Sequence, residues 1–185
     1  MSFRTIDNFT NIYITADLHL SKEKIPKPLY FRGFDKMQDH NNAIRNNINR
    51  VAKSKNDILI INGDLGYEND IDSLLIFIES LTPKVYVVKG NHDNFKNLLT
   101  LKKSGVIKYL GEDLKIRWNN NLFHIHHLPL LEWEGYYQGA FHCFGHCHGK
   151  IQPYLRAMDV GLDANNMKIL NLQDIIEKRN RFQNY

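Results

Sequence analysis

The stretch "KVYVVKGNHD", residues 84–93, decides the fold, because it turns from apolar to polar within a few positions. Its first half is a short β-branched run that predicts a buried strand. An amide, an imidazole and a carboxylate then follow in a row, as Asn91, His92 and Asp93. Three consecutive polar side chains at the end of a buried strand are poorly suited to packing. We therefore expect them to hold a ligand.

Two earlier segments repeat this order of strand and polar end. "NIYIT" at 11–15 predicts a strand that is followed by Asp17 and His19. "DILIIN" at 57–62 predicts a second strand, which is followed by Asp64. In open α/β sheets the ligand site forms beyond the carboxyl ends of the strands, so these distant residues can meet there.

Apolar residues at helical spacing separate the strands of this first half. They predict helices over about 35–53 and 71–78, and a third that starts near residue 95 and that Gly105 can terminate. Strands that alternate with helices indicate a βαβ series. The segment 20–34 is predicted as a long irregular loop, a kind of segment that often carries function.

The second half of the chain has a different character. Its short apolar runs are joined by Asn, Gly and Pro turns, which predicts mostly antiparallel strands, and a last helix is expected over 172–178. The runs are "LKIRW", "LFHIHH", "AFHCFG" and "MDVGL". Two of them end in histidines, which are His126 and His127 in one case and His146 and His148 in the other.

The composition predicts one globular domain over residues 1–185. Hydrophobic residues make up 43% of the chain, and the net charge of +4 only weakly favours an anionic partner. No apolar run approaches the roughly 20 residues that cross a membrane, and the N-terminus has no apolar leader. We therefore expect a cytoplasmic protein with no membrane partner. Cys143 and Cys147 do not suggest a disulfide framework, and no feature indicates the oligomeric state.

The polar residues at the strand ends form a set of oxygen and nitrogen ligands. Carboxylates, imidazoles and an amide suit divalent Mn, Fe, Co, Ni or Zn. The set is too large for one ion, so two ions that share a bridging carboxylate are the simplest arrangement. Such ions, about 3.5–4 Å apart, hold the attacking and leaving oxygens of a displacement at phosphorus.

These residues, taken in order, resemble the five motifs of the calcineurin-like metallophosphoesterases. The motifs are "DLH" at 17–19, "GD" at 63–64, "GNHD" at 90–93, the His of "HLP" at 127–129, and "GHCH" at 145–148. The resemblance extends from about Ile12 to Ile176. It implies an α/β fold of two facing mixed β-sheets flanked by α-helices, and two divalent ions. Manganese is the first expectation, with Fe, Ni, Co or Zn as alternatives.

The same resemblance implies a role for each site residue. The first ion would be held by Asp17, His19 and His148, the second by Asn91, His127 and His146, and Asp64 would bridge the two. His92 would face the substrate and protonate the leaving oxygen. A metal-bound hydroxide would attack phosphorus, because the ions lower the pKa of bound water.

One position departs from the family. Many of its phosphatases carry an Asp three residues after the bridging Asp, to orient the catalytic His, whereas this chain has Tyr67. Asp93 and Glu68 are the two candidates to replace it.

Strand alternation separates the neighbours His126 and His127. Alternate residues of a strand point to opposite faces, so the two cannot both face one ion. The resemblance selects His127, which shares its face with Phe123 and Ile125, and His126 is expected to flank the site.

The remaining polar residues have ordinary explanations. His124 and His142 are expected to be packing or surface residues, and His40 to lie on a helix. Arg32 is expected to be solvated, with contact to a substrate phosphate as the alternative.

The expected function is hydrolysis of phosphate esters. A short chain without an inserted cap implies an open site, which slightly favours a phosphodiester or nucleotide-type substrate. A phosphomonoesterase or protein phosphatase is the alternative within this class. A second class is a non-catalytic module that binds phosphate or nucleic acid. "HCFGHCHG" at 142–149 also has the residue types of a zinc knuckle, although its spacing is poor for one.

Overall fold

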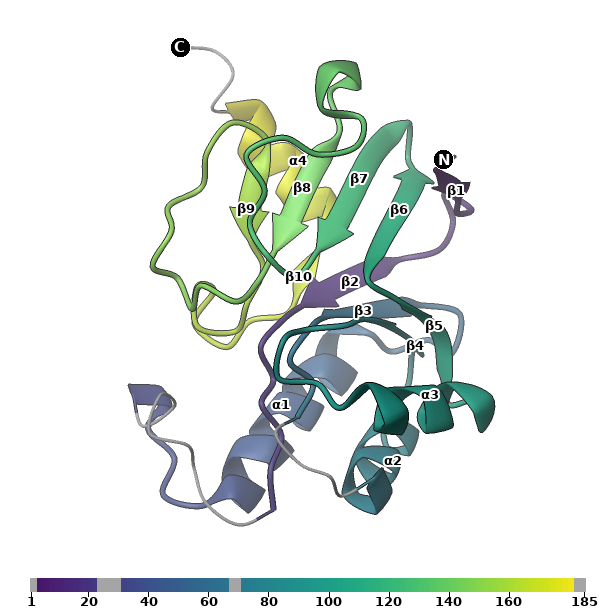
Figure 1. The fold of residues 1–185 in the computed structure, drawn as a ribbon, viewed down its shortest axis with the longest axis vertical. Helices are drawn as coiled ribbons and strands as arrows, with labels where there is room; N and C mark the ends of the chain where they lie inside the picture. Colours follow the sequence, from purple (N-terminus) through teal and green to yellow (C-terminus); the bar gives the residue numbers. More distant parts are fainter. Residues whose placement is uncertain (1–2, 23–30, 67–70, 182–185) are drawn as a thin grey trace.

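The computed structural model describes residues 3–22, 31–66 and 71–181, and places them in two stacked sheets with helices outside (Figure 1). Tyr67 and Glu68 lie outside the described residues. Within those residues there are two five-stranded mixed sheets and four α-helices. The expected class, two facing mixed sheets flanked by helices, is confirmed.

The first sheet has the strand order β10-β2-β3-β4-β5. Its members are β10 (Leu170–Asn171), β2 (Ile12–Thr15), β3 (Ile58–Asn62), β4 (Lys84–Val88) and β5 (Ile107–Gly111). The last four run parallel, and β10 is antiparallel to β2. One face of this sheet is covered by α1 (Met37–Val51), α2 (Ile71–Glu79) and α3 (Phe95–Lys103), as Figure 1 shows.

The second sheet has the order β1-β6-β7-β8-β9. Its members are β1 (Arg4–Thr5), β6 (Asp113–Trp118), β7 (Asn121–His126), β8 (Phe141–Phe144) and β9 (Ala157–Asp159). A 3-10 turn, η2 (Tyr136–Gln138), lies between β7 and β8 in the chain, and α4 (Leu172–Arg181) follows β10.

The expectation of mostly antiparallel strands in the second half is wrong. Within the second sheet, as far as the structure describes it, only β6 and β7 pair antiparallel, through a hairpin whose turn residues Asn119 and Asn120 have φ of 47° and 60°, as a two-residue turn of this kind needs. The pairs β1·β6, β7·β8 and β8·β9 are parallel. Parallel pairing requires the chain to return to the end of the sheet at which the previous strand began. The connections 127–140 and 145–156 are long enough for this return.

Alternating side chains of the central strand β3 explain the two layers of the core. Ile58 and Ile60 pack between the sheets, whereas Leu59 and Ile61 pack against the helices. Each such burial stabilises the fold by roughly 1.5–3 kcal/mol. Because β3 is buried on both faces, its C-terminal end is held rigidly, and this is the end that carries Asp64.

The helices are short on the scale of a membrane. None of those in the described ranges has both the length and the apolar composition required to cross a bilayer.

Candidate metal centre

The polar residues predicted as ligands lie in the loops that follow the strands of both sheets. Five of them have positive φ, a backbone region that residues other than glycine rarely adopt. They are Asp17 (60°), His19 (50°), Asp64 (52°), His146 (66°) and His148 (50°). Strained backbone of this kind concentrates at functional sites, and the motifs alone do not reveal it.

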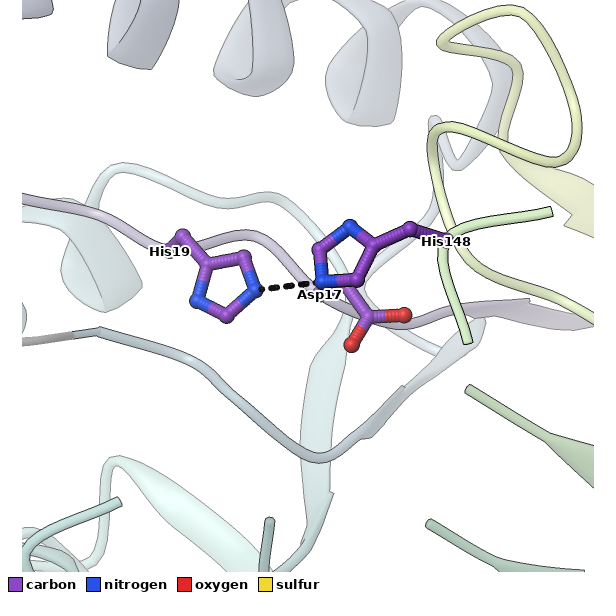
Figure 2. Close-up of side chains that lie close together, drawn as sticks. All are labelled: Asp17, His19 and His148. Carbon is purple, nitrogen blue, oxygen red and sulfur yellow. Dashed lines mark hydrogen bonds between the residues drawn. The ribbon is translucent and has the colours of Figure 1, made fainter. Parts of the chain in front are cut away.

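The first group consists of Asp17, His19 and His148, whose ligand atoms all lie within 4.8 Å of one another. Nε2 of His19 and Nε2 of His148 are 3.3 Å apart, and Figure 2 shows the two rings side by side with a dashed line between these atoms. Both oxygens of Asp17 accept from the backbone N–H of His146, at 3.0 and 3.1 Å. Asp17 and His19 are fully buried. A buried carboxylate beside two converging imidazole nitrogens is suited to a cation.

The second group consists of Asp64, His127 and His146, again with ligand atoms within 4.8 Å. The amide of Asn91 joins it, because its Oδ1 lies 3.0 Å from Nε2 of His127 and 2.8 Å from Nδ1 of His146. Asp64 faces both groups through one atom. Its Oδ2 is 3.3 Å from Nε2 of His127 and 3.8 Å from Nε2 of His19.

Glycines let these groups approach one another closely. A Cβ at Gly63 would overlap the ring of His127, and one at Gly90 would overlap the carboxylate of Asp64. Both motifs therefore need glycine for reasons of space.

Two of the histidines have their second ring nitrogen fixed. Nδ1 of His127 lies 2.8 Å from the backbone carbonyl oxygen of Asn62, and Nδ1 of His148 lies 2.5 Å from Oδ2 of Asp163. A ring that donates from Nδ1 keeps its lone pair on Nε2. In both residues Nε2 is the atom that faces the other candidate ligands.

Burial and neighbouring charges set the pKa values of the site residues. Burial raises the pKa of Asp17 to about 7 and lowers the pKa of His19 to about 3. Burial acts to raise the pKa of Asp64 as well, but the hydrogen bond and charge of His127 outweigh it and hold that pKa at about 2. A neutral His19 and an ionised Asp64 are the protonation states that bind a metal.

His92 stands apart from both groups. It is exposed, its ring centroid lies 5.7 Å from that of His19, and its backbone N–H donates to Oδ1 of Asp64 at 2.9 Å. Asp93, one candidate to orient it, accepts from the backbone N–H groups of Asp64, Leu65 and Gly90 at 2.8–3.0 Å. The carboxylate of Asp93 therefore holds two motif loops together.

The histidines outside the motifs form hydrogen bonds with residues that belong to neither candidate group. His124 lies 3.1 Å from Asp113, and Nε2 of His142 accepts from the backbone of Leu130. His40 lies on α1 and is buried. His126 bonds to the backbone of Leu128 and belongs to neither candidate group.

One expectation about a single residue, Arg32, needs correction. Arg32 is not solvated, because its buried guanidinium pairs with Asp163. Cys143 packs in the core between the sheets, and Cys147 packs beside Trp133 and Phe144. Among the described residues neither thiol belongs to a candidate metal group, so the zinc-knuckle interpretation has no support.

Comparisons with known proteins identify the family and a similar fold. The family model of the calcineurin-like phosphoesterases matches residues 10–176. The uncharacterized protein MJ1445 of Methanocaldococcus jannaschii is 25% identical over 169 residues, which are 90% of this chain and 89% of that protein. The crystal structure of a protein of unknown function, AQ665 from Aquifex aeolicus, is similar in fold. Its TM-score is 0.68 at 16% identity, and the match covers 91% of this chain and 98% of that chain. Because the family match spans most of the sequence, the chain belongs to the calcineurin-like phosphoesterase family.

Proposed function

We propose that this chain hydrolyses phosphate esters with two divalent metal ions, and that manganese is the native metal. The observation that carries the proposal is the position of Asp64. One of its oxygens faces His127 at 3.3 Å and His19 at 3.8 Å, so a single carboxylate is in reach of both groups. This position supports a bridging role for Asp64 between two neighbouring ions.

The donor set fits such ions. Each group combines imidazole nitrogens with a carboxylate, and Asn91 adds an amide oxygen to the second, which suits Mn, Fe, Co, Ni or Zn. When bound, the two ions supply a water of lowered pKa and neutralise the charge on the phosphate. Asp17, His19 and His148 would hold one ion, Asn91, His127 and His146 the other, and Asp64 both.

The remaining chemistry falls to His92 in this proposal. Its backbone bond to Asp64 fixes the start of its side chain beside the metal groups, and its exposed ring is accessible to a substrate. An imidazole there can protonate the leaving oxygen as the ester bond breaks. Which residue orients this ring is not tested, since Glu68, one of the two candidates, lies outside the described residues together with Tyr67.

The substrate is proposed to be a phosphodiester or nucleotide. Asn91, His92 and His146 are all exposed, so one side of the second group and the proposed acid are open to solvent, which suits an extended ester. We further propose that residues 1–185 act as one domain, because each ion would take ligands from loops of both sheets.

The proposal is tested by assaying bis-p-nitrophenyl phosphate beside p-nitrophenyl phosphate, with Mn, Ni, Mg and Zn in turn. We expect metal-dependent release of nitrophenol, faster from the diester, and none from an Asp64→Asn variant. Faster release from the monoester would favour the phosphomonoesterase alternative. Binding of phosphate ligands without turnover under any metal would favour the non-catalytic module.

A further inference from the structure

A buried ion pair that none of the five motifs contains lies behind His148. Arg32 donates to Asp163 twice, from Nε to Oδ1 at 2.6 Å and from Nη2 to Oδ2 at 2.7 Å. The two side chains are 1% and 2% exposed, so the pair is shielded from water. Oδ2 of Asp163 also lies 2.5 Å from Nδ1 of His148. A continuous chain of hydrogen bonds therefore runs from Arg32 through Asp163 to a candidate ligand.

This chain decides which ring nitrogen of His148 faces the first ion. Donation from Nδ1 to a carboxylate leaves the lone pair on Nε2, and a carboxylate partner also makes the imidazole a stronger donor to a metal. Nε2 of His148 points toward His19, 3.3 Å away (Figure 2).

Arg32 also holds the backbone that carries the other two residues of the group. Its Nη2 donates to the carbonyl oxygen of Asp17 at 2.7 Å, and its Nη1 to that of Leu18 at 3.3 Å. Asp17 and His19 flank this contact with φ of 60° and 50°, which are unfavourable conformations for both residues. One guanidinium thus supports all three members of the first group.

The second group has a weaker support of the same kind. Nδ1 of His127 donates to a backbone carbonyl, that of Asn62 at 2.8 Å, rather than to a carboxylate. Its partner residue His146 is exposed and meets the amide of Asn91. The difference between a charged and a neutral partner predicts unequal metal affinities.

We propose that Arg32 and Asp163 are positioning residues that preorganise the first group, so that the first ion binds more tightly than the second. Asp163 sets the orientation of His148, and Arg32 holds Asp163 together with the backbone of Asp17 and Leu18. The inference rests on the proposed function only in requiring two divalent ions, and it does not depend on turnover.

The test measures Mn²⁺ affinity by calorimetry in two half-site variants. His127→Ala leaves the first group intact, and His19→Ala leaves the second. We expect the His127→Ala protein to bind Mn²⁺ more tightly than the His19→Ala protein. Adding Asp163→Asn should weaken binding about 10–100-fold in the first background and less than about threefold in the second, the range known for outer partners of metal ligands.

Two further variants separate positioning from general damage. Arg32→Gln combined with Asp163→Asn leaves an amide pair in place of the ion pair, and should weaken the first ion alone without leaving an unpaired buried charge. Asp57→Asn is the matched control. Asp57 is also a buried carboxylate, 4% exposed, but it precedes β3 at the opposite end of the sheet and bonds to Asn11 and Ser54. It should change neither affinity.

Equal weakening of both ions by Asp163→Asn, or no weakening of the first, would overturn the inference. A second measurement applies if the variants fail to fold. Nitrogen NMR of the unaltered metal-free chain should show the proton of His148 on Nδ1, and a proton on Nε2 alone would equally refute the assignment. If these results hold but no ester is hydrolysed, the proposed function fails and the positioning role stands.

Discussion

Replacing His127 and His126 in turn by Ala should give opposite results, although the residues are neighbours. His127 is 2% exposed and donates to the buried carbonyl of Asn62 at 2.8 Å. Removing it leaves that carbonyl without its partner, which costs about 1–3 kcal/mol of unfolding free energy in the metal-free protein. His126 is partly exposed, and within the described ranges its ring bonds to the backbone of Leu128 alone, so its loss should cost less than about 1 kcal/mol.

The effect on metal binding should separate the two variants further. His127→Ala removes a proposed direct ligand, and the loss should exceed the roughly 100-fold upper range that an outer partner contributes. His126→Ala should change Mn²⁺ affinity by less than about threefold, since His126 belongs to neither candidate group. Urea unfolding without metal and calorimetric titration with Mn²⁺ measure the two effects. The reverse pattern would mean that His126 carries the ligand role and that the assignment of this strand end is wrong.

Three other perturbations have definite expectations. Asp64→Asn should abolish turnover and weaken both ions in a metal titration, because the proposed bridge loses its charge; full activity in this variant would contradict the bridge. His92→Asn should keep both ions while slowing turnover by about 100-fold, the scale of positioned acid catalysis; loss of metal would instead make His92 a ligand. Burial lowers the pKa of His142 to about 4 from an ordinary 6.5, so its stabilising effect is complete above pH 6.5 and is lost as pH falls toward 4. The loss should reach about 3 kcal/mol in urea unfolding, at about 1.4 kcal/mol per pH unit. In the His142→Gln variant, the unfolding free energy should change with pH by one proton's worth less than in the unaltered protein. An unchanged pH dependence would show that another group titrates.

The first half of the fold was predictable because its signals are local. Apolar runs such as that of β3 and the helical spacing of Ile44 and Ile48 in α1 each fall within one element, and both are buried as expected. The strands β1, β5 and β10 were missed. Two of them have only two residues, and Ile107–Gly111 at the sheet edge is mostly half-exposed, with little periodicity to detect.

Strand direction in the second half was mispredicted because turn residues say little about long connections. The Asn119–Asn120 turn does form the predicted hairpin. The segments 127–140 and 145–156 also contain Gly and Pro, but their length allows a crossover to a parallel strand. Length was the signal that could have corrected this expectation.

The candidate site likewise has a part that the sequence predicts and a part that it does not. Its motif residues follow strands, so their meeting at one edge could be predicted from topology. The support from Arg32 and Asp163 could not, because the two residues are separated by 131 positions and neither stands at a motif. Asp163 lies in the segment "GLDANN" after the last motif, and only the folded chain brings it to His148.

The central claim is a pair of ions bridged by Asp64, and anomalous diffraction from crystals grown with Mn²⁺ tests it most directly. The account predicts two peaks about 3.5–4 Å apart, one on each side of Oδ2 of Asp64. One peak should lie against His19 and His148, and the other against His127 and His146. A single fully occupied peak, or two peaks that do not share Asp64, would contradict it.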